Sequence, residues 1–323
     1  MRAPRTYVVP MVLLALLSCS RAEKPRSMAK VRMNVSPMLK FGAFSIAKEE
    51  GFFAAEGIDP QFVEIDQASG LLAATSGDLD VFTGPVRSGL FNAMLRGSSL
   101  RIVADNGHFE PMPCSPESFL APAPMADRIA ANGGSLRGER VAIIPGGVTE
   151  YVIEKLLEKN GLTKADVELA QVPQGDFLSR ANRKMDAVSY TTEPKLSQAL
   201  ADGSMKVIAT SQDVAPGHQH SVVTFGRRLL HDDPELGRRV MRAYLRGVRR
   251  YNEGKSERNV AILARHSKLP PAVIRATCWL PIAGDGEIRD EDIQPILDWF
   301  LARGYLEAPI ARSVWWNGNF IKP

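Results

Sequence analysis

The residues best suited to bind a small molecule lie in loops that follow predicted strands. The first is a glycine pair, Gly146-Gly147, which follows a strand over 140–144 and precedes a helix that starts at Thr149. Free backbone N–H groups at a helix N-terminus attract a sulfonate, carboxylate or phosphate. The loop lacks the lysine and serine of a phosphate loop, so nucleotide hydrolysis is not implied. An anion site is one interpretation, and a plain connection between strand and helix is the other.

Three further loops are expected at the same end of the predicted sheets. They follow strands at 31–35, 80–83 and 187–190. Together the four loops supply the candidate ligand-binding residues, which are Met38, Lys40, Phe41, Gly84, Pro85, Gly146, Gly147, Thr149, Tyr190, Thr191 and Glu193, with Pro37 beside the first of them. In open α/β sheets the carboxyl ends of the strands face the ligand, so all four loops are predicted to converge on one cleft.

The types of these residues suggest roles. Phe41 and Tyr190 could sandwich a flat ring and Met38 could adapt around it, although packing in a core is the alternative for each. Glu193 could bond a ring nitrogen or an amine, but capping the helix that begins after it is the preferred interpretation. Lys40 is the only basic residue of the set, whereas strong oxyanion receptors usually use arginine. An aromatic or heterocyclic ligand is therefore favoured over a bare sulfonate.

Strands and helices alternate in two series along the chain. The first series runs over 31–104 and the second over 140–209, where it includes a helix expected at 176–183. Such alternation predicts an α/β protein with mostly parallel sheets and helices on both faces. Five prolines between 106 and 124 leave room for an extended piece and no helix. Beyond Pro234 the chain is expected to be almost wholly helical, with helices at 234–252, 257–266, 271–277 and 291–303.

Two α/β units separated by two extended crossings predict two lobes with a cleft between them. Lobe I is expected to comprise 30–116 and 222–323, and lobe II 117–221. The hinge strands are predicted near 118–122 and 221–225.

The N-terminal segment is typical of an exported protein. Arg2 and Arg5 precede an apolar run that is too short to span a bilayer but fits a secretory signal over 1–18. The run ends in Leu-Leu-Ser-Cys, which resembles the lipobox of bacterial lipoproteins and predicts lipidation of Cys19; an ordinary signal is the alternative. Residues 19–29 would then form a lipidated tether, and a membrane contact is expected through this anchor alone.

Charge and cysteine content narrow the class further. The chain has 40 basic and 36 acidic residues, and its basic cluster at 238–250 has helical spacing, which indicates a solvated helix face and not a nucleic-acid surface. Two cysteines remain after Cys19. Cys114 and Cys278 could pair in an oxidising compartment, but two isolated buried thiols are an equal alternative.

A longer stretch supports a family resemblance. Residues 41–58, with Ala47-Lys48-Glu49-Glu50-Gly51-Phe52-Phe53 and Glu56-Gly57-Ile58 at their centre, resemble the signature of type II periplasmic solute-binding proteins of ABC importers. The similarity continues through 76–80, 96–101, 136–142, 161–167, 186–188 and 193–194, and covers about 31–311. The subfamily it resembles binds nitrate, sulfonates, taurine or thiamine precursors. Ala43 replaces a proline that this subfamily often has.

The resemblance implies a two-lobed fold, joined by two crossing strands, that binds a small organic ligand without a cofactor. It also implies a periplasmic monomer that delivers the ligand to an ABC permease. Phe52 and Phe53 are then scaffold residues that pack the end of a short helix on the sheet.

Other classes remain open. The same fold resembles a pyrimidine-precursor synthase, but the cysteine cluster of that enzyme has no counterpart here, so no enzymatic activity is expected. His218 and His220 lie in a Pro/Gly loop and are interpreted as a surface turn, with a metal pair as the less favoured alternative. A sensor or accessory lipoprotein of a non-ABC system is the third possibility.

Overall fold

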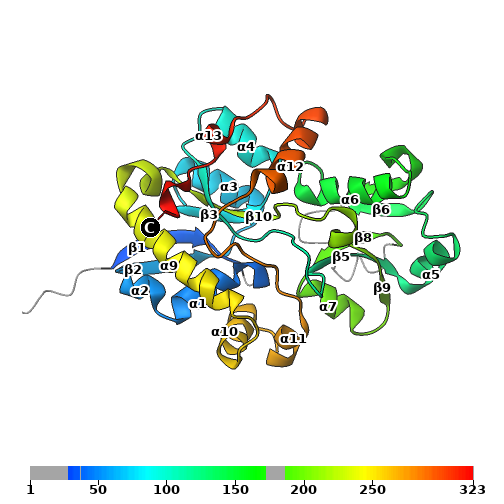
Figure 1. Cartoon of the computed structure of the whole chain (residues 1–323), viewed down its shortest axis with the longest axis horizontal. Coiled ribbons are helices and arrows are strands. Elements are labelled where there is room, and N and C mark those ends of the chain that lie inside the picture. The colour runs from blue at the N-terminus through cyan, green and yellow to red at the C-terminus, as the bar shows by residue number, and fades with distance from the viewer. Residues whose placement is uncertain (1–27, 37, 172–185, 323) are drawn as a thin grey trace, which may run out of the picture.

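The computed structural model describes residues 28–36, 38–171 and 186–322. The predicted signal, Cys19, Pro37 and the helix expected at 176–183 lie outside the described residues. Figure 1 shows two lobes side by side, one containing both the first strands and the C-terminal helices, the other formed by the middle of the chain. Within the part of the chain that the structure describes, no helix has the length and apolar character needed to cross a membrane.

Lobe I contains a five-stranded sheet in the order β2-β1-β3-β10-β4. Its strands are β1 (Ala29–Asn34), β2 (Ile58–Val63), β3 (Val81–Pro85), β4 (Arg101–Asp105) and β10 (Ser221–Phe225). β1 runs parallel to β2 and β3, whereas β10 is antiparallel to β3 and β4. The ends of β1 and β3 therefore lie at the same edge of the sheet, which places the loops after Asn34 and Pro85 near each other.

Helices cover this sheet on both faces. They are α1 (Gly42–Glu49), α2 (Phe52–Ala55), α3 (Gln67–Ser76), α4 (Ser88–Leu95), α9 (Pro234–Asn252), α10 (Glu257–Ser267), α11 (Pro271–Ala276), α12 (Asp290–Ala302) and α13 (Arg312–Trp315). α9 lies across α1 (Figure 1), and Gly247 allows the close approach, because a Cβ there would lie 2.3 Å from the Ala43 carbonyl oxygen. Phe53 is buried in this core and Phe52 packs beneath Arg246, which confirms their scaffold role.

Lobe II contains the remaining strands. β5 (Glu117–Pro122) lies between β8 (Ser189–Thr192) and β9 (Met205–Thr210), antiparallel to both. β6 (Arg140–Ile143) is parallel to β7 (Glu168–Gln171), and a bridge from Val141 to Val188 connects the two groups. The helices described in this lobe, outside 172–185, are α5 (Ala123–Ala131), α6 (Val148–Lys159), α7 (Lys195–Leu200) and α8 (Ser211–Val214).

Two features differ from the sequence-based expectation. The sequence predicted no helix up to Pro124, but α5 begins at Ala123, so this prediction was wrong. Pro124 lies in the first turn of the helix, where a backbone N–H would have no partner in the helix and proline is tolerated. The extended stretches predicted as hinge strands are β5 and β10, which belong to the two sheets. The chain crosses between the lobes just before each of them, and the two crossings pair at His108 and Gln219.

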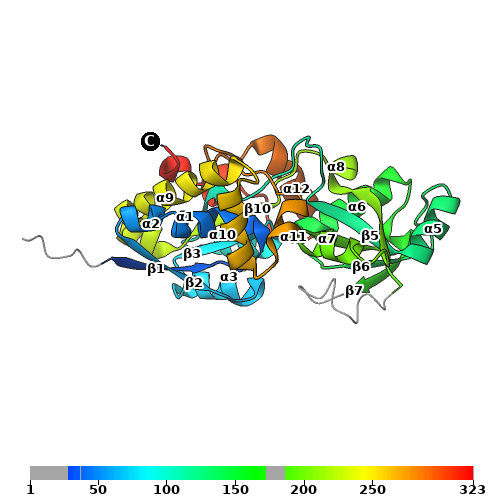
Figure 2. The same cartoon turned by 90° about the horizontal axis from the view of Figure 1, so that it is seen from below.

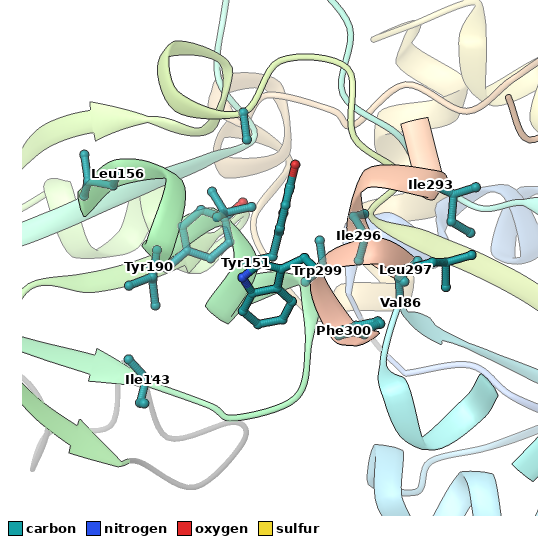
Figure 3. Close-up of a cluster of buried hydrophobic side chains, with 14 of the residues drawn as sticks. Val86, Ile143, Tyr151, Leu156, Tyr190, Ile293, Ile296, Leu297, Trp299 and Phe300 are labelled. Atoms are coloured by element: carbon teal, nitrogen blue, oxygen red, sulfur yellow. The ribbon is translucent and has the colours of Figure 1, made fainter. Parts of the chain in front are cut away.

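The lobes also touch through a shared apolar cluster. Figure 3 shows Tyr151 from α6 beside Trp299 from α12, with ring centroids 5.8 Å apart. Val86, Ile296 and Phe300 belong to the same buried cluster. Seen from below in Figure 2, α12 and α6 lie where the two lobes meet. α12 therefore joins the C-terminal part of lobe I to lobe II.

Candidate functional site

Lys40 lies at the boundary between the lobes, in the turn that follows β1. A cavity of only about 20 Å³ lies beside it, lined by Glu117, Thr192 and Glu193 from lobe II and by Leu39 and Leu280 from lobe I. That volume holds roughly one water molecule. Among the described residues, the contacts of the ammonium are the Phe41 ring, 5.4 Å from Nζ, and the charge of Glu117. Burial lowers the pKa of Lys40, and Glu117 opposes this shift.

Glu117 is the centre of a buried polar network. It is 2% exposed at the start of β5. One carboxylate oxygen lies 2.9 Å from Nε2 of His220, and the other accepts the Tyr190 hydroxyl, which lies 2.6 Å from Oγ of Ser211. Burial would raise the pKa of Glu117, but His220, Tyr190 and Lys40 together hold it below its usual range. The Glu117 carboxylate therefore fixes the positions of the His220 and Tyr190 side chains at the junction of the lobes.

The sequence did not indicate this network. His218 and His220 are 2% and 3% exposed, so their interpretation as a surface turn was wrong. His218 stacks on Phe109 with ring centroids 4.3 Å apart, and burial lowers its pKa to about 4. Within the residues that the structure describes, no three His, Cys, Asp or Glu side chains are grouped to hold a metal ion.

The two aromatic candidates do not lie on either side of one cavity in this conformation. Phe41 is fully buried in the core of lobe I. Tyr190 is 3% exposed, packs on Phe119 and belongs to the other large cluster. Burial, followed by the charge of Glu117, raises the pKa of the Tyr190 hydroxyl well above its usual value. A core role therefore accounts for both rings, and Met38 packs at the edge of the lobe I core.

The glycine loop connects the two lobes. Gly146 has φ 73° and donates its N–H to Glu150, 2.8 Å away, while its carbonyl accepts the N–H and hydroxyl of Ser88, both at 3.1 Å. The N–H of Val148 donates to Val86 at 3.0 Å. Part of the predicted anion site at the start of α6 is thus bonded to protein groups. Thr149 is half-buried in the first turn of this helix.

Arg87 is a basic residue that the sequence-based set missed. It lies between β3 and α4, and a Cβ on Gly147 would be 3.7 Å from its Cγ. Its guanidinium donates to the Pro145 carbonyl at 3.4 Å, and burial lowers its pKa. No carboxylate in the described chain pairs with it. Arg87 lies one residue before α4, at the edge of the sheet where β1 and β3 end. That position in the sequence could have identified it as a candidate ligand-binding residue.

The other candidates have structural partners. Gly84 has a close neighbour, since a Cβ there would lie 1.9 Å from Oε1 of Gln67, and Pro85 pairs with Ser221 in the sheet. Thr191 is 2% exposed, and its hydroxyl has no hydrogen-bond partner among the described residues. Glu193 accepts the N–H and hydroxyl of Ser197 at 3.0 and 2.7 Å, which confirms the preferred interpretation as a cap of α7.

Solved structures share this architecture. The ligand-binding component of an ABC-type import system from Staphylococcus aureus, with zinc bound, aligns at TM-score 0.75 and 15% identity, covering 91% of this chain and 98% of that one. The alkanesulfonate-binding protein SsuA from Xanthomonas axonopodis pv. citri, bound to MOPS, aligns at TM-score 0.66 and 20% identity, covering 89% and 98%. The desulfurization enzyme DSZB aligns at TM-score 0.64 and 14% identity, covering 91% and 97%.

At these identities the likeness establishes the fold, which confirms the predicted two-lobed α/β class of periplasmic binding proteins. No curated protein matches the sequence. The model of the NMT1-like family matches residues 24–265. Because that match covers most of the sequence, the chain belongs to the NMT1-like family.

Proposed function

We propose that this protein is an extracytoplasmic solute-binding lipoprotein, anchored through Cys19, that binds a small organic anion between its lobes and delivers it to an ABC permease. The observation that carries the proposal is Lys40, a half-buried lysine at the lobe boundary whose ammonium no described residue holds in a hydrogen bond. An anionic ligand would supply the missing partner, because a desolvated ammonium is stabilised by a bonded opposite charge.

Arg87 supports an anion rather than a neutral ring. It lies at the same edge of the sheet as Lys40, next to the start of α6, and it has no carboxylate partner in the described chain. Guanidinium groups bind sulfonates and carboxylates in a bidentate manner. Since Phe41 and Tyr190 are engaged in cores, the reason for favouring an aromatic ligand is weakened. A sulfonate or carboxylate is therefore the first candidate, and a thiamine precursor the second.

The mechanism rests on lobe movement. The 20 Å³ cavity is too small for an organic ligand, so a ligand requires the lobes to separate around Lys40. Backbone bonds from Ser88 to Gly146 and from Val148 to Val86 hold the lobes together and must break for such an opening. A ligand that contacts both lobes would favour the closed form, which presents both lobe surfaces to a permease.

A thermal-shift screen of taurine, alkanesulfonates, small carboxylates and pyrimidines tests this function. A ligand at 100 times its dissociation constant stabilises by about 2.7 kcal/mol, enough for a clear shift. We expect one ligand class to stabilise the wild type and to fail with Lys40→Met, and small-angle scattering to show a change in compactness on binding. Equal shifts in wild type and Lys40→Met would contradict the proposed site.

The alternative is an enzyme, because a desulfurization enzyme shares the fold. The hydroxyl of Ser211 bonds Tyr190 and the Glu117 carbonyl, and not a histidine, so it lacks the base of an activated nucleophile. Product formation from the stabilising ligand, followed by chromatography, would distinguish an enzyme from a receptor. A sensor or accessory role would show ligand binding without an ABC permease partner.

A further inference from the structure

α9 presents a row of arginines to the solvent, on the side that faces away from the core of lobe I. The helix contains six arginines and a single acid, Glu235. Its opposite side, which includes Tyr244 and Val248, is buried in the lobe I core. The exposed arginines recur three or four positions apart and are Arg238, Arg242, Arg246 and Arg249. Like charges at this spacing repel each other, so the row destabilises the helix unless an opposite charge lies over it.

Carboxylates of the described chain neutralise the first half of this arginine row. Glu235 accepts hydrogen bonds from Arg238 and Arg242, at 2.9 and 3.4 Å. Glu56, at the end of α2, accepts a further bond from Arg242 at 2.9 Å. Two acids therefore balance the first two arginines of the row.

The second half of the row keeps its positive charge. The guanidinium carbon of Arg246 lies 4.2 Å from the centroid of the Phe52 ring. Glu253, just beyond the helix, pairs with Arg250. Among the residues that the structure describes, no carboxylate pairs with Arg246 or Arg249. Two exposed guanidinium groups are thus available to an anionic surface.

The N-terminal end of the described chain lies beside the start of α9. Ala29 donates its N–H to the Gly57 carbonyl at 2.9 Å, and the adjacent Glu56 carbonyl accepts a bond from Arg239 of α9 at 2.7 Å. Met28 and Arg239 line the same cavity at this corner of lobe I. Figure 2 shows β1, α2 and α9 at the same end of the lobe. The chain before Met28 therefore leaves the fold next to the arginine row.

The length of that chain limits how far α9 can lie from a membrane. From Cys19 to Met28 the chain advances nine residues, which span at most about 32 Å when fully extended. The segment between them contains three basic residues and one acid, Glu23. A protein anchored through Cys19 would therefore keep the start of α9 within about that distance of the lipid surface.

An anionic lipid surface is the partner that these observations favour. Clusters of basic residues on an amphipathic helix bind anionic headgroups, and a basic patch strengthens the hold of a lipid anchor. From the exposed arginine row, its unbalanced second half and the chain that leaves the fold beside it, we propose that the exposed face of α9 docks on anionic phospholipid headgroups. This contact goes beyond the one that the sequence predicted, which was through the anchor alone. Because α9 packs on α1 and α2, docking would hold lobe I and leave lobe II free to move.

Co-sedimentation with phospholipid vesicles tests the proposal. The mature chain with Cys19→Ser carries no acyl group, so binding through the anchor is excluded. At about 50 mM NaCl we expect this protein to sediment with vesicles of phosphatidylcholine that contain about one third phosphatidylglycerol, and to stay in solution with phosphatidylcholine alone. Raising NaCl to about 500 mM should release it, because salt screens exposed charges.

Two pairs of substitutions on this background separate charge from packing. Arg246→Gln and Arg249→Gln should each weaken vesicle binding about fivefold, and together about 25-fold, since each removes one basic charge near the lipid surface. Arg246→Lys with Arg249→Lys keeps both charges and should bind the vesicles as strongly as the parent chain, although it alters the contact with Phe52.

Arg32→Gln with Arg137→Gln is the matched control, because it removes the same charge elsewhere. Arg32 is exposed in β1 between Val31 and Met33, which are buried in the core beneath α9, so its side chain points to the opposite face of the sheet. Arg137 is exposed in lobe II. This double variant should bind the vesicles unchanged.

The proposal is overturned if the protein does not sediment with anionic vesicles, if it binds neutral vesicles equally well, or if the two glutamine double variants lose equal affinity. Binding to polyglutamate without binding to anionic vesicles would assign the face to an acidic protein partner and would also overturn it. The measurement uses neither a ligand nor an acyl group, so its failure leaves the proposed function untouched, and a failed ligand screen leaves this surface standing.

Discussion

The indole N–H of Trp299 donates a 2.8 Å hydrogen bond to the carboxylate of Glu154 across the boundary between the lobes. Glu154 is 4% exposed on α6 and also bonds Arg303 and Lys164. Burial would raise the pKa of Glu154, but bonds from Arg303, Lys164 and Trp299 lower it. This charged contact and the apolar cluster around it connect α6 with α12, so we expect the lobes to pivot there when the Lys40 side opens.

Removing the indole N–H should weaken this connection. Trp299→Phe keeps an aromatic ring but deletes the donor to a buried carboxylate, and bonds to charged groups contribute about 1.5–3 kcal/mol. We expect a loss of about that size in the free energy of unfolding, measured by urea denaturation. Trp316→Phe, a half-buried indole that packs on Trp315, is the control and should lose less. Equal losses in the two variants would show that the bond to Glu154 adds no stability.

Lys40 should matter for the ligand and not for folding. The side chain is half-buried and its ammonium has no hydrogen bond in the described chain, so Lys40→Met removes a desolvation cost and should leave the melting temperature unchanged or higher. Ligand affinity should fall by about 10- to 100-fold, because a charge-assisted bond is lost. Lys48→Met, an exposed lysine on α1, is the control for calorimetry. A destabilised variant with unchanged affinity would assign Lys40 a structural role.

The fold was largely predictable and the site was not, for physical reasons. α9 was predicted with the bounds that the structure shows, because Asp233 and Pro234 mark its start and its apolar stripe is regular. Most strands were found to within one or two residues at their ends. β3 continues to Pro85 and β8 to Thr192, so the candidates Gly84, Pro85, Tyr190 and Thr191 lie in strands and not in the loops that follow them. Glu117 escaped prediction because its bond to Tyr190 joins residues 73 positions apart, and no local pattern signals such a pair. Arg87 escaped because its partners come from the other lobe.

His218 should make stability depend on pH in the mildly acidic range. Its imidazole donates from Nδ1 to the Ala215 carbonyl at 2.6 Å, and burial lowers its pKa from 6.5 to about 4. Between these values the unfolded chain binds a proton that the folded chain does not, so stability falls as the pH falls from 6.5 to 4. A shift of this size is worth about 3 kcal/mol at pH 4.

The His218→Asn variant keeps a donor near Ala215 and removes the titrating ring. Urea unfolding at pH 7, 5.5 and 4.5 should show a smaller loss of stability on acidification than the wild type shows. His231→Asn, at an exposed histidine, is the matched control and should follow the wild type. A wild-type slope retained in His218→Asn would place the titrating group elsewhere.

The disulfide should contribute a large part of the stability of lobe I and the crossings. The sequence left the pairing of Cys114 with Cys278 open, and the structure joins them across 164 positions. Closing so long a loop restricts the unfolded chain, and the chain-entropy model gives about 5 kcal/mol, whereas proteins commonly show about 2–4 kcal/mol. We expect Cys114→Ser with Cys278→Ser to lower the free energy of unfolding by about that amount. Reductant should lower the unfolding free energy of the wild type to that of the double variant and leave the variant unchanged. If thiol titration shows that the wild type is fully reduced and its unfolding free energy is still unchanged, the disulfide does not contribute this stability.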